Sequence, residues 1–406
     1  MFCVVGVQCF GMGMALRGTN QEFGRPYNRR IVLEAIRLHG PLTRADIARR
    51  VGLTPQTVAN IVRELEVQGF ILSRREAPKG RGYPAAALAL NPEGGFAVGI
   101  HVTPRGLEAG LVNLAGTIVA RARRDLPHID PDTAFREIGT MVPALAAHRP
   151  AGRMLGVGLA MPGPFDVESM SFVGPTTLEG WKDVPVRQVL TTVTGLPSFI
   201  EVDLAAAANA EQLYGAGRRF RAFYYLFFGV GLGGSMVHDG AALRGAWGNA
   251  GEIGHMPAVP GGDPCPCGNL GCLERYVSLD AYERRRGVLG EDGWLAEAAP
   301  LFRSAMLTIE NLFDPETVVV GGLAPQGLIE RLAAAAMPLA NSVAARRDRA
   351  APRVTFSGLG PDAVLLGAAA LAVSGVLSPR FGILFAEGPR PASRDPILES
   401  SEAHPA

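Results

Sequence analysis

Apolar residues near the amino end of the chain recur at helical spacing in three short segments. The segments cover residues 28–39, 43–51 and 54–69. Thr43 and Thr54 stand where a helix N-cap is needed, and Pro55 takes the first helical position after Thr54. The pattern predicts three helices, the last two separated by a short turn at Gly52.

Two short apolar runs after these helices predict a β-hairpin. The runs, 70–73 and 87–90, flank a loop over 74–84. A helix, a short glycine-containing turn and a second helix make the motif that places the second helix in the major groove of DNA, and the hairpin would be its wing. The exposed face of the third helix and the tip of the wing supply the residues that we expect to contact DNA: Thr54, Gln56, Thr57, Asn60, Arg63, Lys79 and Arg81.

Positive charge is concentrated in the same part of the chain. Residues 25–81 contain twelve Lys or Arg and five Asp or Glu, a balance of +7, so the rest must carry −6 for the whole to reach +1. A basic amino-terminal part suits binding to a polyanion, whereas the body, with its net negative charge, does not. A three-helix oligomerisation module is the alternative, but spacing, turn, hairpin and charge together favour DNA. We expect a dimer or tetramer on an inverted repeat in double-stranded DNA.

Beyond residue 91 the pattern changes to apolar runs that alternate with helical segments. The predicted strands are 96–102, 106–113, 117–124, 154–160, 199–202, 223–228, 317–320 and 354–356. The predicted helices are 133–147, 204–214, 303–313, one from Leu328 and one from Ala363. The glycine run 229–234 would let backbone amides approach a phosphate or a sugar, or would form a hairpin turn. Two successive strand–helix halves predict a bilobed α/β body with a cleft between the lobes.

The composition is that of an ordinary globular protein, with 406 residues, 48% hydrophobic and 19% charged, enough for two or three domains. Residues 1–24 lack a basic start and a cleavage site, so we expect a disordered lead, with Met12 or Met14 as another translation start. No stretch reaches the length of a membrane span, and 379–406 should be a disordered tail. We therefore expect a DNA-binding domain over 25–90 and a body over 91–378, in a reducing cytoplasm and without a membrane partner.

Three of the five cysteines fall within eight positions, shortly after a histidine. Together the segment supplies His255, Cys265, Cys267 and Cys272. Imidazole and thiolate are the ligands that tetrahedral zinc prefers, and one His with three Cys is a closed structural set. A disulfide or a pair of buried thiols is the alternative, but Cys-x-Cys is a poor disulfide geometry. We predict one structural Zn2+, which leaves the neighbouring Glu252 and Glu274 free for another role.

These segments together resemble the ROK family, which groups repressors and sugar kinases of the actin-like ATPase superfamily. The resemblance covers nearly the whole chain from about Tyr27 to Leu377. It rests on the segment 251–274, the turn 161–164, the glycine run 229–234, the stretch 312–322 and the winged helix. It implies an α/β fold class, in which an N-terminal winged helix-turn-helix precedes a bilobed actin-like (ribonuclease H-like) body.

The resemblance also implies a sugar site. Glu252, His255 and Glu274 would contact hydroxyls of the sugar, and Asp203 matches the catalytic base of the kinases. Thr177 stands where the family usually has an asparagine. His255 would bind zinc through one ring nitrogen and face the ligand with the other. Carboxylates suit this site because hydroxyls donate well to charged acceptors.

Two departures from the kinase pattern bear on activity. Kinases carry Asp-x-Gly-Gly-Thr to hold phosphate and magnesium, whereas this chain has His101-Val-Thr-Pro-Arg-Gly. The sugar-contacting Glu-Asn-Asp of the kinases is Glu201-Val202-Asp203 here. Phosphoryl transfer needs nucleotide and metal held in line, so we expect no appreciable kinase activity.

The sequence thus predicts a transcriptional regulator, a repressor of carbohydrate genes, whose operator affinity is changed by a sugar in the cleft. Two alternatives are an ATP-dependent sugar kinase with an appended DNA-binding domain and a DNA-binding scaffold with a vestigial cleft. The segment that begins at His101 argues against the kinase. Asp203, Glu252 and Glu274 argue against the scaffold.

Overall fold

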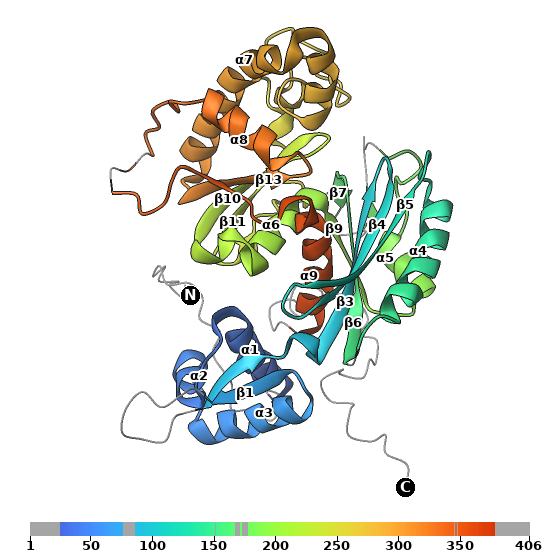
Figure 1. The fold of residues 1–406 in the computed structure, drawn as a ribbon, viewed down its shortest axis with the longest axis vertical. Coiled ribbons are helices and arrows are strands. Elements are labelled where there is room, and N and C mark those ends of the chain that lie inside the picture. Colours follow the sequence, from blue (N-terminus) through green and yellow to red (C-terminus); the bar gives the residue numbers. More distant parts are fainter. Residues whose placement is uncertain are drawn as a thin grey trace, which may run out of the picture.

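The computed structural model of the chain describes residues 25–75, 86–150, 152–166, 171–172, 178–344, 346 and 348–377. These residues form a small unit at the amino end and two α/β lobes (Figure 1). The expected lead and tail, the wing tip with Lys79 and Arg81, and Thr177 lie outside the described residues.

The amino-terminal unit combines three helices with a two-stranded antiparallel sheet. Its elements are α1 (Arg25–His39), α2 (Arg44–Val51), α3 (Pro55–Val67), β1 (Ile71–Arg75) and β2 (Ala86–Leu90). Val58, Val62 and Leu65 of α3 are buried in the core of this unit, as the helical spacing of apolar residues requires. The three predicted helices and the hairpin are confirmed.

Side-chain caps fix the turn between α2 and α3. Thr43 forms a reciprocal capping box at the start of α2. Gly52 ends that helix in the left-handed conformation, with φ of 68°, where glycine has no Cβ penalty. The Oγ1 atom of Thr54 accepts a hydrogen bond from the backbone N–H of Thr57 at 3.2 Å, and Pro55 occupies the first turn of α3. The caps therefore define where α2 ends and where α3 begins.

The first lobe is a five-stranded mixed sheet in the order β5-β4-β3-β6-β9. Its strands are β3 (Gly95–Thr103), β4 (Gly106–Asn113), β5 (Ile118–Asp125), β6 (Arg153–Met161) and β9 (Ser198–Val202). The first three form the predicted antiparallel meander, and β6 and β9 extend the sheet in parallel. One face is covered by α4 (Pro131–Ala146) and α5 (Val186–Thr194), while β7 (Phe165–Asp166) and β8 (Ser171–Phe172) form a separate ribbon (Figure 1).

The second lobe is another five-stranded sheet, in the order β12-β11-β10-β13-β14. Its strands are β10 (Ala222–Phe228), β11 (Leu232–His238), β12 (Ala241–Ala242), β13 (Thr317–Gly322) and β14 (Val354–Phe356). The helices α7 (Leu279–Phe313) and α8 (Gln326–Ala335) cover one face. The glycine run 229–234 is the hairpin between β10 and β11, where Phe228 pairs with Leu232.

Two helices, α6 (Asp203–Tyr214) and α9 (Ala363–Leu377), pack between the two sheets (Figure 1). The contact is close: a Cβ on Gly158 of β6 would lie 1.7 Å from the carbonyl oxygen of Ala368. Among the described residues, Gly360–Leu377 is the one helical window apolar enough to span a membrane, with a mean hydropathy of 1.6 and 72% burial. Packing on both sides accounts for this apolar composition.

The amino-terminal unit and the first lobe share one hydrophobic core. The body contributes Leu155 of β6, Ala210 of α6 and Val376 of α9 to the cluster that contains the buried residues of α1, α2 and α3. The guanidinium of Arg153 lies over the ring of Phe70, 4.6 Å from its centroid. The small unit is therefore packed onto the first lobe and not merely tethered to it.

Candidate functional site

The predicted metal ligands come together on the loop between β12 and α7. Cys265 Sγ lies 3.5 Å from His255 Nδ1, and Cys267 Sγ lies 3.6 Å from Cys272 Sγ. All four ligand atoms lie within 4.8 Å of one another. In a tetrahedral site with metal–ligand distances of about 2.0–2.3 Å, neighbouring ligand atoms are about 3.4–3.8 Å apart. The donor set and its spacing fit such a metal.

Backbone turns hold this loop in place. Gly271 has a φ of 71°, and a Cβ there would lie 1.7 Å from the carbonyl oxygen of Val259. The turn that carries two of the thiols is closed by hydrogen bonds from Cys265 N to Asn269 O and from Gly268 N to Cys265 O, both 2.9 Å. A hydrogen bond from the backbone of Asn269 lowers the pKa of Cys267 to about 7, which favours the thiolate that metals bind, whereas desolvation raises the pKa of Cys265 and of Cys272.

Two carboxylates flank the imidazole of His255. His255 Nε2 lies 3.7 Å from Glu252 Oε2, and Nδ1 lies 3.6 Å from Glu274 Oε1. The ring therefore turns Nδ1 toward Cys265 and Glu274, and Nε2 toward Glu252. Gly251, with φ of 108°, brings this segment against β11, because a Cβ would lie 1.8 Å from the carbonyl oxygen of Gly234. The histidine lies between the thiols and the carboxylate of Glu252.

Asp203 approaches from the other side, as the first residue of α6. Its Oδ1 accepts a hydrogen bond from the backbone N–H of Leu204 at 2.7 Å. Burial, with a contribution from the charge of Glu252, raises the pKa of Asp203 to about 6. Burial also raises the pKa of Glu252. The charge of Glu252 acts on Asp203, and His255 lies beside Glu252 and Glu274. We call these four residues the interlobe site, a candidate ligand site at the lobe boundary: Asp203, Glu252, His255 and Glu274.

Sequence reasoning missed one residue at this boundary. Arg244, on the loop after β12, forms an ion pair with the buried Glu201 of β9, with 2.5 Å between Nη2 and Oε2. The resemblance to the kinases concerns Glu201 only as part of the Glu201-Val202-Asp203 sequence. The sequence indicates only that a basic side chain stands shortly before Gly251. This does not reveal that its partner lies in the other lobe.

The predicted DNA-contacting residues of α3 lie on one outward face. Gln56, Asn60 and Arg63 are exposed, and the apolar residues of the helix point inward. Gln56 Nε2 lies 3.4 Å from Asn60 Oδ1, one helical turn away. Thr54 and Thr57 are occupied in the cap at the start of the helix. Polar side chains on this face are free of the protein core.

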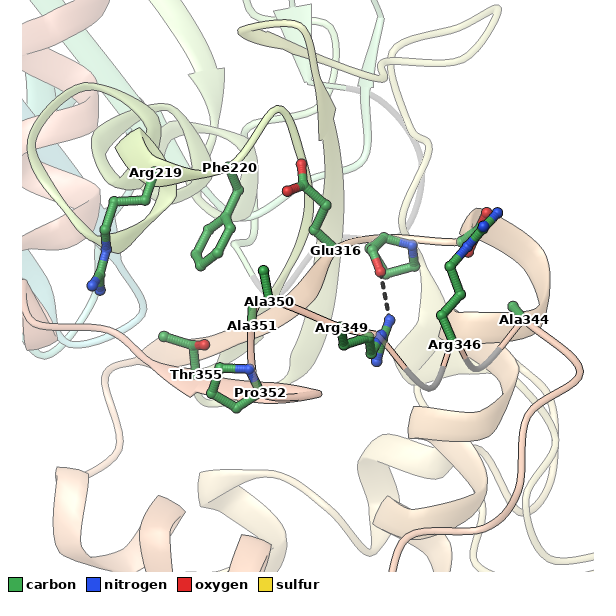
Figure 2. A pocket seen from close by; sticks show the side chains of 12 residues that line it. Arg219, Phe220, Glu316, Ala344, Arg346, Arg349, Ala350, Ala351, Pro352 and Thr355 are labelled. Atoms are coloured by element: carbon green, nitrogen blue, oxygen red, sulfur yellow. Dashed lines mark hydrogen bonds between the residues drawn. The ribbon is translucent and has the colours of Figure 1, made fainter.

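A pocket of about 620 Å³ lies elsewhere in the second lobe (Figure 2). It is lined by residues just before three parallel strands: Phe220 before β10, Glu316 before β13 and Pro352 before β14. Arg349 on its wall donates to the carbonyl of Pro315 at 2.8 Å (Figure 2). Arg349 also pairs with the buried Glu310. The pocket is therefore at the opposite end of the sheet from the glycine hairpin and separate from the interlobe site.

These features define the class of protein: a helix-turn-helix unit is joined to a two-lobed α/β body, and the body carries a His/Cys cluster beside carboxylates. The model of the ROK family matches residues 97–301, and the model of the MarR family matches residues 23–82. The chain belongs to the ROK family. The predicted family and fold class are confirmed.

Known relatives include both regulators and kinases. The chain is 27% identical to the xylose repressor of Bacillus subtilis over 64% of this chain and 68% of that protein, and 28% identical to the DNA-binding transcriptional repressor Mlc of Escherichia coli over 60% of each. A crystal structure of a ROK family transcriptional regulator, a homologue of E. coli Mlc, is similar with a TM-score of 0.69 and 23% identity, over 90% of this chain and 99% of that one. The ROK hexokinase of Thermus thermophilus is similar with a TM-score of 0.57 and 29% identity, over 69% and 99%.

Proposed function

We propose that the chain is a DNA-binding transcriptional regulator, a repressor of carbohydrate genes, whose affinity for DNA responds to a sugar. The observation that carries the proposal is the polar face of α3 on a unit whose core continues into a lobe of the interlobe site. Relatives that are named xylose repressor and DNA-binding transcriptional repressor support it. A regulator of this kind works where the DNA is, so the proposal includes a location in the cytoplasm.

In this proposal α3 enters the major groove. Gln56 and Asn60 would read base edges, because a single side-chain amide can form hydrogen bonds to both N6 and N7 of adenine. Arg63, with Lys79 and Arg81 of the wing, would add sequence-independent affinity through phosphates. A symmetric dimer or tetramer would place two such helices on an inverted repeat with half-sites about 34 Å apart.

The sugar would bind in the interlobe site. The carboxylates of Asp203, Glu252 and Glu274 would accept hydrogen bonds from hydroxyls, and Thr177 would add a further contact. His255 Nε2 points toward Glu252, so it is the nitrogen available to a ligand. Zinc bound at Nδ1 would fix the tautomer of the ring.

We propose one structural zinc ion held by His255, Cys265, Cys267 and Cys272. The close approach of one imidazole and three thiols supports this assignment. The ion would order a loop that has few apolar residues of its own. Zinc would supply no catalytic step here, because the four protein ligands complete a tetrahedral shell.

A sugar kinase with an appended DNA-binding domain is the second candidate, and the similarity to a hexokinase favours it. The segment where the kinases hold phosphate argues against it. Thr103 pairs with Gly106, so Pro104 and Arg105 form a two-residue hairpin turn with little backbone free to hold a phosphate. His101 also stands where the kinases have an acid, and an imidazole offers no carboxylate for magnesium. Burial lowers the pKa of His101 to about 4, so the ring is neutral at pH 7.

One experiment tests the proposal as a whole. Purified full-length protein is used to select duplexes from random DNA, and a matched Gln56→Ala/Asn60→Ala variant is carried in parallel. We expect the wild type to enrich an inverted repeat that the variant does not enrich. A coupled assay with ATP across hexoses, pentoses and amino sugars is run on the same preparation. Turnover on the order of 1 per second or more, without DNA enrichment, would instead establish the kinase.

A further inference from the structure

The two lobes are joined by an ion pair that the sequence patterns did not reveal. Glu201 lies on β9 of the first lobe and is only 2% exposed. Arg244 reaches it from the second lobe, with Nη2 2.5 Å from Oε2, and its side chain is 29% exposed. The other carboxylate oxygen accepts a hydrogen bond from the backbone N–H of Val202 at 3.2 Å. The contact is therefore an ion pair between the lobes in which the carboxylate is buried and the guanidinium is partly exposed.

Burial makes this pair consequential. Desolvation raises the pKa of Glu201, and the positive charge of Arg244 opposes that effect. Breaking a buried pair by removing one partner is costly, because the remaining charge stays buried without compensation. Separation of the lobes would also take away the positive charge that offsets the desolvation of Glu201.

A second ion pair between the lobes provides a contrast. Arg105 of the β3–β4 turn lies 3.2 Å from Glu283 of α7, but the two side chains are 68% and 44% exposed. Exposed pairs of this kind contribute little, because water and salt screen them. Of these two contacts, the Arg244–Glu201 pair should determine how the lobes are held.

The pair lies at the start of a direct route to the DNA-binding unit. Glu201 is two residues before Asp203, where α6 begins. At the other end of α6, the ring of Tyr214 packs against Gly116 of the first lobe and joins the core shared with α1. Its burial raises the pKa of Tyr214, and the nearby charges of Arg37 and Glu34 on α1 act on it. The helix therefore connects the interlobe site with the unit that carries α3.

The loop of Arg244 connects to the same site from the other lobe. It continues through Ala250, whose backbone N–H donates to the carbonyl of Arg244 at 3.0 Å, into Gly251 and Glu252. A ligand held between Asp203 and Glu252 would thus contact both segments that carry the ion pair, the one with Glu201 and the one with Arg244.

We propose that Arg244 is a positioning residue, which holds the lobes through Glu201 in the arrangement that binds DNA. The inference rests on the proposed function, because it assigns the route by which the interlobe site acts on α3. The pair is formed in the structure, and on this proposal its loss weakens DNA binding whether or not a ligand is added.

The test compares Arg244→Met, Glu201→Gln, the double variant, Arg244→Lys and the control Arg105→Met. Affinity for a duplex selected by the wild type is measured without sugar at 10 °C, with circular dichroism to show that each variant is folded. We expect each single change at the pair to weaken binding about 5-fold or more, within the usual range of roughly 5- to 150-fold for coupled sites. The double variant should be no weaker than the worse single variant, because both changes remove one interaction.

The two remaining variants separate positioning from a general charge effect. Arg244→Lys keeps the charge without the planar fork and should recover part of the affinity. Arg105→Met removes the exposed pair between the lobes and should stay within twofold of the wild type. Unchanged affinity in folded Arg244→Met, additive losses in the double variant, or an equal loss in Arg105→Met would each overturn the proposal.

Hydrogen exchange keeps the proposal testable if the wild type selects no DNA and the proposed function fails. Exchange is measured on the full chain for wild type, Arg244→Met and Arg105→Met. We expect faster exchange of the α6 amides over residues 203–214 in Arg244→Met alone, because one end of the helix loses its anchor. Equal exchange in all three proteins would show that the pair does not position α6.

Discussion

At the residue scale, the interlobe site depends on carboxylates that are partly withdrawn from water. Asp203 is the clearest case, because its pKa is raised from 3.8 to about 6 by burial and by the charge of Glu252. Glu252 remains half-exposed, with His255 on one side of it. Such carboxylates accept few hydrogen bonds from water. A ligand whose hydroxyls donate to them would therefore supply hydrogen bonds that water provides only in part.

The raised pKa of Asp203 predicts a pH dependence of stability. The folded protein binds this proton more tightly than the unfolded chain, so the contribution to stability is present below about pH 4 and is lost as pH rises through about 6. Asp203→Asn removes this dependence. We expect the free energy of unfolding of the wild type to fall by up to about 3 kcal/mol relative to the variant between pH 4 and 7. Denaturant titrations across this range measure it, and a difference that does not vary with pH would show that Asp203 is solvated.

Glu252 allows the ligand role to be separated from the structural roles. Glu252→Ala should keep zinc and DNA binding, because the carboxylate is neither one of the four clustered metal ligands nor part of the α3 surface. It should lose the response of DNA affinity to the sugar. The measurement is binding to the selected duplex with and without the sugar that gives the largest thermal shift. The competing interpretation is that Glu252 only stabilises its own glycine-rich turn, and an unchanged response would support it.

At the element scale, the loop that carries His255 is the part most dependent on a metal. We expect about one zinc per chain in protein purified without chelator, since four donors complete a tetrahedral shell. Cys267→Ser should lower both the zinc content and the melting temperature, because binding energy for a structural metal is folding energy. Elemental analysis and thermal unfolding of both proteins are the measurements. A chelator should reproduce the effect in the wild type, and metal-free protein of equal stability would exclude the structural role.

The exposed face of α3 makes a separate prediction. Asn60→Ala should relax the sequence preference at one base pair and weaken specific binding by about 1–3 kcal/mol. Lys79→Ala and Arg81→Ala should weaken binding to all sequences alike and reduce its dependence on salt. Competition binding against duplexes with single base changes distinguishes the two behaviours. Equal losses on all sequences for Asn60→Ala would place this residue on the phosphate backbone.

Elements with strong local signals were predictable from the sequence. The helix-turn-helix could be predicted from the caps at Thr43 and Thr54 and from the helical spacing of apolar residues in α3. The meander could be predicted from successive strand patterns separated by short turns. The long helix α7 was predicted only over its last third, because glycines and Pro300 interrupt the helical pattern and Gly290 has non-helical angles of φ 72° and ψ 172°. Strand β11 was missed because Gly233 and Gly234 suggested a turn.

In the candidate site, too, features formed by residues close in sequence could be predicted, and contacts between distant segments could not. The His255 cluster could be predicted because its ligands are close in sequence, and their chemistry is specific. The Arg244–Glu201 pair could not be predicted, because it joins segments from different lobes and neither residue type indicates a partner. Contacts of this kind depend on the packing of the lobes and not on local pattern.

At the scale of the whole molecule, the shared core is the feature that links the parts. Residues of β6, α6 and α9 complete the core of the helix-turn-helix unit, so movement of the first lobe carries α3 with it. A flexible linker would isolate the unit from events between the lobes. The described contacts instead provide a continuous packed path, which is the physical requirement for coupling two sites.

We propose that a sugar in the interlobe site changes the affinity of α3 for DNA. The most direct measurement is the affinity of the full-length wild type for its selected duplex with and without saturating sugar. Coupling of roughly 1–3 kcal/mol is typical of linked sites, so we predict a change of about 5- to 150-fold. A sugar that stabilises the folded protein but leaves the DNA affinity unchanged would contradict the account.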